Sequence, residues 1–225
     1  MSSQPTITVR GEATLEVDPE LAVVQVSVTA RDRGRQRALD LLARRNEQIL
    51  TLIRAHGAAV ERLDSSPVQV SPEVKDAKGR ERVIGYVARA GVTVTVGDFS
   101  ILGDLVMKLA DQEMVTVTGP WWQLRVDSAA YRQARVAAAQ DAMLRAREYA
   151  AAFGGRVSGL LEVADQHLLT TAREPGGPTF LRARAAAAGM AGEEAPAEFD
   201  FEPARQTVSA QVEARFTMTA PEFSD

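Results

Sequence analysis

The stretch that decides the fold is residues 6–31, TITVRGEATLEVDPELAVVQVSVTAR. Its apolar side chains occupy odd positions in 7–17, and the buried set then moves to even positions in 21–31. A period of two is typical of a strand with one buried and one solvent-exposed face. The intervening Asp18-Pro19-Glu20 favours a turn, because proline fixes φ and donates no backbone hydrogen bond. We therefore predict that 7–17 and 21–31 pair as a long antiparallel hairpin.

Outward from this stretch, the pattern changes between helical and strand-like periods. Long helices are predicted at 35–56 and 128–153. Between them a short helix is predicted, with Asp98 or Ser100 as its N-cap and with inward residues Leu102, Leu105, Val106 and Leu109. Further strands are predicted at 68–74, 84–96, 115–126, 157–163 and 208–218. Gly57 and Gly154-Gly155 suit helix ends, and Gly91 inside its strand predicts a bulge or a bend. The last long helix has a stripe of small and aromatic residues that would let it lie close to a sheet. This stripe consists of Ala134, Ala138, Ala142, Ala146, Tyr149 and Phe153.

The resulting order, ββαββαβαββ, predicts an α+β fold: mostly antiparallel, long-stranded sheets with helices packed on one face. We expect a single domain at 6–220 between a short flexible N-terminus, 1–5, and a C-terminal tail, 221–225. Residues 166–206 show no apolar period and are rich in glycine, proline and alanine, which predicts a long mobile loop. Phe199 and Phe201, at the end of this loop, are expected to dock it on the body of the domain.

Composition excludes several classes of site. The 225 residues include 26 basic and 30 acidic side chains, a net charge of −4, with no cysteine and two histidines. Disulfides, thiolate metal sites and a cysteine nucleophile are therefore impossible. His56 and His167 leave little for a zinc site or a Ser-His-Asp triad. We expect no catalytic residue, no metal and no cofactor.

The ends and the apolar runs of the chain bear on location. The start, MSSQPT, has neither the basic nor the apolar region of a signal peptide, so a cytoplasmic location is expected. No apolar run approaches the ~20 residues of a membrane-spanning helix, so no integral membrane segment is expected.

Trp121 and Trp122 are the first candidate interface residues. Neighbouring residues on a strand point to opposite faces, so one ring can be buried while the other is exposed. The exposed ring could anchor a protein partner or a sister subunit, since tryptophan is enriched at binding hot spots. The alternative is that both rings are core or edge residues around a bulge. We place Phe199 and Phe201 in the same candidate interface.

A second candidate is the basic cluster at the start of the first helix, formed by Arg31, Arg33, Arg35 and Arg37. Cations at this end oppose the helix dipole, so the cluster could be an anion patch. The alternative is a solvated helix start in an arginine-rich protein. Nucleic acid is not expected as a partner, because the chain is net acidic and the cluster has no interleaved aromatic residues.

Several segments resemble the SIMPL-domain family. They are Val9–Val17 with Asp18–Ala22, Gly85–Ala88 running into Val92–Val94, the start of the helix near Asp98, the alanine-rich helix 134–153 with its Gly154-Gly155 end, and the strand 208–218. The resemblance covers roughly residues 5–220 and includes no catalytic motif. It implies an α+β fold, ring-like or barrel-like self-assembly, and no reaction. The proline–tryptophan entry at 120–122, the longer loop and the missing leader depart from the family pattern.

Family members are associated with bacterial envelopes, often the periplasm, and with protection from oxidative stress, while an animal relative is a signalling adaptor. By this resemblance the chain is expected to be a non-catalytic homo-oligomer with a scaffold or stress-protective role. Two other hypotheses stay open. One is an adaptor that recognises a protein partner through 166–206, and the other is a small-ligand binder or an enzyme of unknown type.

Overall fold

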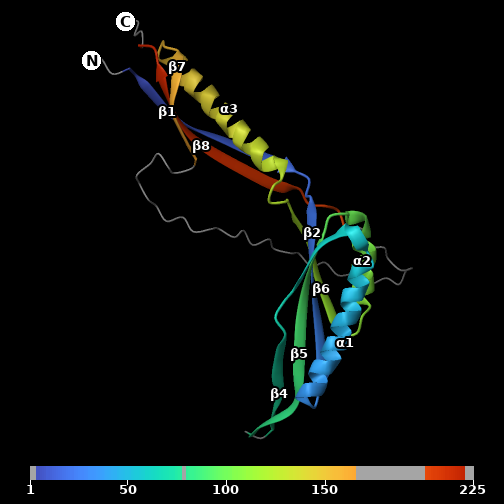
Figure 1. Ribbon diagram of the computed structural model, residues 1–225. Coiled ribbons are helices and arrows are strands. Elements are labelled where there is room, and N and C mark those ends of the chain that lie inside the picture. The colour runs from blue at the N-terminus through green and yellow to red at the C-terminus, as the bar shows by residue number, and fades with distance from the viewer. Residues whose placement is uncertain (1–3, 78–79, 166–200, 221–225) are drawn as a thin grey trace, which may run out of the picture. The chain divides into compact units, whose positions relative to one another are not determined.

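The computed structural model describes residues 4–77, 80–165 and 201–220, which form two compact units (Figure 1). The described part of unit 1 comprises 4–17, 126–165 and 207–220, and that of unit 2 comprises 18–125, except 78–79, and 201–206. Each unit has its own sheet. Both sheets lie within residues 6–220. The expectation that this range forms a single domain stays a prediction.

Unit 1 contains a three-stranded sheet in the order β1-β8-β7. Its elements are β1 (Thr6–Val17), α3 (Ala129–Ala152), β7 (Val157–Asp165) and β8 (Gln206–Met218). β7 and β8 are antiparallel. β1 also runs antiparallel to β8, because the contacts Thr8–Arg215, Arg10–Glu213 and Thr14–Ser209 follow opposite sequence orders. The two ends of the chain thus pair in one sheet.

α3 lies against β1, and the contact depends on small residues (Figure 1). A Cβ atom on Gly11 would be 2.0 Å from the Ala138 carbonyl oxygen and 2.5 Å from the Ala142 nitrogen, so only glycine fits there. Every fourth helix residue on this side is a buried alanine, namely Ala130, Ala134, Ala138, Ala142, Ala146 and Ala150. The predicted end of the stripe was wrong. Tyr149 and Phe153 are about half exposed, because the ridge of residues spaced by four continues through Ala150.

Both ends of α3 follow the sequence signals. The Ser128 hydroxyl accepts a hydrogen bond from the Ala130 N–H at 3.3 Å and so caps the first turn. At the other end Gly154 adopts a φ of 72°, and the N–H groups of Gly154 and Gly155 donate to the carbonyls of Ala151 and Ala150. This pair of bonds is a Schellman motif, which satisfies the last carbonyls of the helix.

Unit 2 contains a five-stranded antiparallel sheet in the order β3-β5-β2-β6, with β4 also paired to β5. Its strands are β2 (Leu21–Asp32), β3 (Val60–Ser65), β4 (Gln69–Ala77), β5 (Arg80–Val96) and β6 (Val115–Gln123). Its helices are α1 (Arg35–Arg54) and α2 (Leu102–Ala110), with short 3-10 turns η1 (Gly57–Ala59) and η2 (Phe99–Ile101). The Asp98 side chain caps η2 by accepting from the Ser100 N–H.

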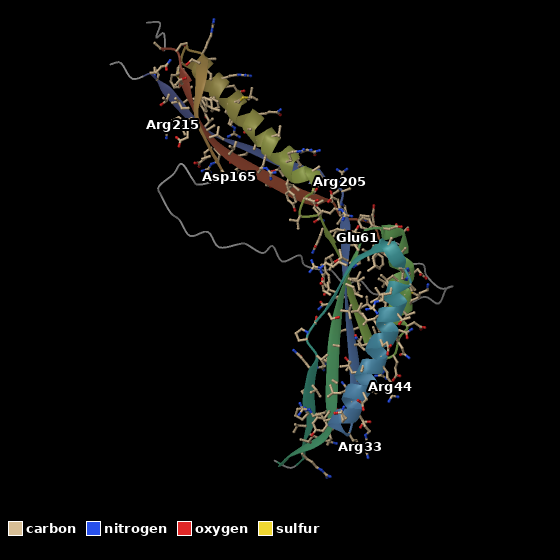
Figure 2. All side chains as sticks on the ribbon, in the orientation of Figure 1. Arg33, Arg44, Glu61, Asp165, Arg205 and Arg215 are labelled. Carbon is tan, nitrogen blue, oxygen red and sulfur yellow. The ribbon has the colours of Figure 1, made fainter. Side chains whose placement is uncertain are left out.

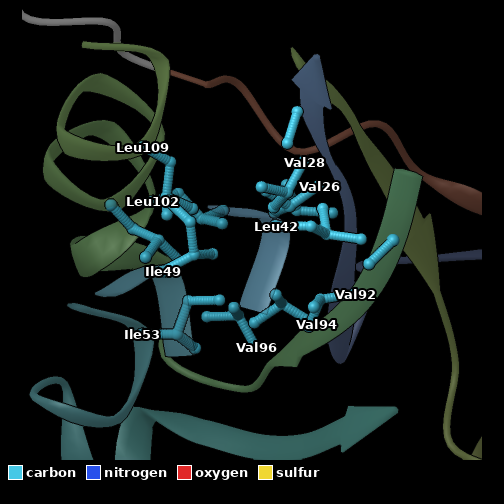
Figure 3. Close-up of a cluster of buried hydrophobic side chains, with 14 of the residues drawn as sticks. Val26, Val28, Leu42, Ile49, Ile53, Val92, Val94, Val96, Leu102 and Leu109 are labelled. Atoms are coloured by element: carbon cyan, nitrogen blue, oxygen red, sulfur yellow. The ribbon is translucent and has the colours of Figure 1, made fainter. Parts of the chain in front are cut away.

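The core of unit 2 lies between the sheet and its two helices (Figure 3). Even-numbered residues of β2 and β5 pair across the sheet, for example Val26 with Val92, and these side chains have almost no exposed surface. The helices contribute Leu42, Ile49, Ile53, Leu102, Leu105 and Leu109 to the same cluster. Fully burying an aliphatic side chain contributes about 1.5–3 kcal/mol, so this cluster is the main source of stability in unit 2.

Two predictions about the strands were wrong. β1 and β2 exist with nearly the predicted bounds but do not pair: β1 joins β8, and β2 lies between β5 and β6. The structure has one strand more than predicted, β3. Only Val60 and Leu63 of β3 are partly buried, so its sequence shows no alternation of apolar and polar residues that would predict a strand. At Gly91 the pairing of β5 with β2 continues without a shift, so no bulge lies there, and the bend stays a prediction. The register shift in β5 lies between Gly85 and Val83. A Cβ atom on Gly91 would be 3.0 Å from the Ser66 hydroxyl, a side-chain atom that can rotate.

Candidate functional site

The two tryptophans occupy opposite faces of β6, as predicted. Trp122 pairs with Ala22, on the helix-covered face, and its ring meets Phe99 edge-on at a centroid distance of 4.9 Å. Trp121 pairs with Val23 on the other face and is 45% exposed. Trp122 is therefore a core-packing residue, while Trp121 is open to solvent. The interface role of Trp121 stays a prediction.

Phe201 packs against the buried cluster of unit 2. Four residues further along the chain, the guanidinium of Arg205, which is labelled in Figure 2, lies 3.4 Å from the Asp18 carboxylate. Phe199, His167 and most of the predicted loop lie outside the described residues. Docking of the chain at Phe201 therefore agrees with the sequence analysis, and the interface role of Phe199 stays a prediction.

The arginine cluster lies where β2 ends and α1 begins. The Asp32 carboxylate accepts from the Gly34 N–H at 2.7 Å and from Arg37 Nε at 3.0 Å. The Gly34 hydrogen bond and the Arg37 charge hold the pKa of Asp32 below its ordinary value. Arg31, Arg33 and Arg35 are exposed. The structure thus brings the predicted cluster together, with Arg37 engaged by Asp32.

Glu61 and Arg125 form an ion pair that the sequence analysis missed. Both terminal nitrogens of Arg125 lie 2.5 Å from the Glu61 carboxylate oxygens, and the Arg125 N–H donates to Glu20 at 2.9 Å. The hydrogen bonds from Arg125 lower the pKa of Glu61. Gly97 makes room for this carboxylate, since a Cβ there would overlap the Glu61 side chain. No sequence signal could reveal a pair whose members lie 64 positions apart.

The edge of the unit 1 sheet formed by β7 is the most distinctive surface of that unit. Leu160 pairs with Phe216 and Val163 pairs with Ala214, and both of these β8 residues face α3. The side chains of Leu160 and Val163 are nevertheless 58% and 56% exposed. Leu161, at the register shift between Leu160 and Glu162, is 56% exposed. α3 therefore leaves the apolar side of β7 uncovered, and β7 is an outer strand of its sheet.

The opposite edge, formed by β1, is protected. The Glu12 N–H donates to the Asp141 carboxylate on α3 at 2.9 Å, and Arg145 holds that carboxylate at 2.8 Å. A carboxylate of the helix thus accepts the hydrogen bond of one backbone N–H group at this edge, which a neighbouring strand would otherwise accept. The sheet of unit 1 has one edge that is partly capped and one that is apolar, and only the second invites pairing with another strand.

The face of this sheet away from α3 is polar, as predicted, but more buried than expected. Glu213 on the central strand is ion-paired with Arg10 at 2.9 Å, and its side chain is 7% exposed. Arg215 lies 3.3 Å from Glu162 on β7 (Figure 2). The Gln211 side-chain oxygen is buried and has no hydrogen-bond partner among the described residues. These contacts hold the three strands together and form no recognisable reaction centre.

Two further features of the described residues concern ligand binding, namely His56 and an apolar pocket beside α1. His56 lies 3.8 Å from Asp104, and no group of three or more His, Asp or Glu side chains in 4–77, 80–165 and 201–220 could hold a metal ion. An apolar pocket of about 370 Å³ lies between α1 and the strands, lined by Leu39, Leu42, Leu50, Val68 and Ala90 among others. No helix in the described part of the chain is long and apolar enough to cross a membrane.

The chain belongs to the SIMPL family, a family described as a protein of unknown function (DUF541), which matches residues 7–216. This confirms the resemblance drawn from the sequence. No curated protein matches the chain.

Among solved structures, the chain is similar to a de novo designed protein, Foldit4, at 16% identity and a TM-score of 0.24, covering 45% of this chain and all of that one. It is also similar to a putative amidohydrolase/peptidase from Burkholderia cenocepacia, at 13% identity and a TM-score of 0.28, covering 52% of this chain and 29% of that one. An amidase of the hydantoinase/carbamoylase family from Burkholderia phymatum matches at 15% identity and a TM-score of 0.27, covering 60% and 34%. Likenesses this low carry no argument about function.

Proposed function

We propose that this SIMPL-domain protein is a non-catalytic, self-assembling protein with a scaffold or stress-protective role. The observation that carries the proposal is the outer edge of β7, where three aliphatic side chains are more than half exposed and no strand among the described residues pairs. Natural proteins usually protect such edges with lysine, proline or a covering element. β7 has neither lysine nor proline, and its protection is limited to Glu162, Asp165 and two register shifts.

Pairing with another copy would complete this edge. A second β7 strand would satisfy outward-pointing N–H and C=O groups and would remove Leu160, Leu161 and Val163 from water. Each fully buried aliphatic side chain contributes about 1.5–3 kcal/mol. The contrast with β1, whose Glu12 N–H is already occupied by Asp141, supports β7 rather than β1 as the assembling edge.

The test is the molar mass of the protein by size-exclusion chromatography with light scattering at micromolar concentration. The wild type is expected to be an oligomer. The double substitution Leu161→Lys with Val163→Lys should convert it to a smaller species, because charges at an edge oppose strand pairing. Val136→Lys with Leu144→Lys is the matched control, since these α3 side chains are 50% and 54% exposed.

Two results would contradict this proposal. A wild-type monomer would exclude self-assembly, and equal dissociation by the β7 and α3 substitutions would exclude the β7 edge. The alternative adaptor role depends on residues 166–206, of which the structure describes 201–206. The adaptor role is tested separately by deleting residues 166–200 and measuring whether the protein still captures its partner.

A further inference from the structure

One end of unit 2 combines basic and aliphatic side chains that neither the fold nor the proposed assembly uses. At this end the last residue of β2, Asp32, pairs with Tyr86 of β5. Gly85 lies against the same turn, because a Cβ on it would be 3.1 Å from the Asp32 carbonyl oxygen and 3.9 Å from the Arg33 Cα. Figures 1 and 2 show that β4 and β5 continue past the start of α1 and that Arg33 lies at this end.

The charge here is opposite to that of the whole chain. We call this surface the basic end, and define it by its six basic side chains and two acidic ones. These are Arg31, Arg33, Arg35, Arg37, Lys75 and Arg82, with Asp32 and Glu73. The net charge of the basic end is +4, in a chain whose net charge is −4. The intervening sequence 76–81 has two basic and two acidic residues and so adds no net charge.

The arginines lie where helix stability disfavours them. α1 begins at Arg35 with no side-chain cap and no acidic residue in its first turn, so cations face the positive end of the helix dipole. Only Arg37 is engaged by Asp32 within hydrogen-bonding distance. Arg31 and Arg35 make no ion pair with any residue that the structure describes. A locally unfavourable arrangement of this kind is typical of a functional surface.

Exposed aliphatic side chains lie directly beside these charges. Val74 of β4 pairs with Val83 of β5, and the two are 46% and 49% exposed. Ile84, between Gly85 and Val83, has no partner on β4 and is 45% exposed. Arg82 and Lys75 continue the same two strands by one residue. The hairpin therefore presents an aliphatic cluster, with Lys75 and Arg82 one residue further along each strand and on the opposite face of the sheet.

We propose that the basic end docks on the surface of an anionic lipid bilayer, with Val74, Val83 and Ile84 entering the headgroup region and the arginines contacting lipid phosphates. Anionic membranes attract basic segments, and adjacent apolar side chains add affinity by leaving water. A nucleic acid would use the charges but not the aliphatic cluster, and Tyr86, the aromatic ring nearest to the hairpin, packs against the core.

The first test is co-sedimentation of the full-length chain with vesicles. We expect binding to phosphatidylcholine vesicles that contain about a third phosphatidylglycerol, and none to phosphatidylcholine alone. Raising the salt from about 50 mM to about 500 mM should weaken binding, because exposed charges are screened. Arg33→Glu with Arg35→Glu should lower the partition coefficient roughly tenfold or more. Arg132→Glu with Arg135→Glu on α3 changes the net charge equally and should have little effect.

The second test does not alter the arginines. Because the chain has no cysteine, Val83→Cys provides one attachment point for an environment-sensitive fluorophore. Its emission should shift to shorter wavelength with anionic vesicles, whereas a label at Val136→Cys on α3 should not respond. Urea denaturation of each variant shows whether it is folded.

The proposal is overturned if the Val83 label does not respond to anionic vesicles, or if the two arginine pairs contribute equally to sedimentation. It is also overturned if duplex DNA binds as tightly as anionic vesicles do, since the cluster would then be a general polyanion site. Because the β7 variants keep the basic end intact, their oligomeric state reports on assembly independently of this test.

Discussion

At the scale of single residues, Glu61 illustrates how a long-range pair stabilises an otherwise weak element. β3 has only two partly buried side chains, so its packing alone fixes it poorly. The two hydrogen bonds from Arg125 to Glu61 connect this strand to the segment that follows β6. Such bidentate pairs are geometrically specific, although exposed ones contribute modest free energy.

A pH dependence follows from this pair. Because the pKa of Glu61 is lower in the folded state than its ordinary value near 4.5, the pair stabilises unit 2 above that pH. This stabilisation is lost as the pH falls through the folded-state pKa. Glu61→Gln should therefore lower the free energy of unfolding by at most about 1 kcal/mol at neutral pH and have no such effect in acid.

Urea denaturation of the wild type and Glu61→Gln between pH 3 and pH 7 measures this difference. Glu47→Gln, on the exposed side of α1, is the control and should change stability little at any pH. A difference between wild type and Glu61→Gln that stays constant through the acid range would show that the effect of Gln is not due to the charge.

At the scale of elements, the contact of α3 with β1 depends on the absence of a side chain at Gly11. The Ala138 and Ala142 backbone atoms occupy the position that any Cβ would take. Backbone of a regular helix cannot shift locally without breaking its hydrogen bonds, so even a methyl group must move α3 off the sheet.

Gly11→Ala should therefore destabilise unit 1 by about 1–3 kcal/mol, the usual cost of overpacking. Gly159→Ala is a matched control on β7, where the nearest obstacle is the Thr217 hydroxyl at 3.0 Å, a side-chain atom that can rotate. We expect Gly159→Ala to cost less than about 1 kcal/mol. The two midpoints of urea denaturation give the comparison, and similar values would contradict the close approach of α3 to β1.

Elements also show what sequence can and cannot predict. Alternation identified β1, β2, β5 and β8, and the signals at Ser128 and Gly154-Gly155 located α3, because these patterns are local. The partner of a strand is not local: the same alternation in β1 suits pairing with β2 or with β8, 190 or more positions away. The apolar residues of β7 predicted a strand but not its exposure, since exposure depends on where α3 lies.

The candidate sites divide in the same way. The arginine cluster was found because its members are close in sequence, and the opposite orientations of Trp121 and Trp122 follow from strand geometry alone. The Glu61–Arg125 pair and the aliphatic cluster beside Arg33 required the fold. Ile84 begins the strand predicted at 84–96, but its side chain is 45% exposed because β5 extends beyond the helix that covers its other half.

At the scale of the whole molecule, the chain consists of two units that share no sheet. Unit 2 is nearly continuous in sequence, whereas unit 1 is assembled from the beginning, the middle and the end of the chain. The buried cluster of unit 2 is drawn almost wholly from 18–125, with Phe201 as a partly buried addition. Unit 2 therefore has the requirements of an independent folding unit.

We predict that a fragment of residues 18–125 folds by itself. It contains every strand of the five-stranded sheet, both helices and the Glu61–Arg125 pair, so its unfolding in urea should be a single cooperative transition. Loss of the Phe201 contact should make the fragment less stable than unit 2 in the intact chain. The intact chain should in turn show a second transition that Gly11→Ala shifts and the fragment lacks. A fragment without dispersed amide resonances in its NMR spectrum would mean that unit 2 needs unit 1 to fold.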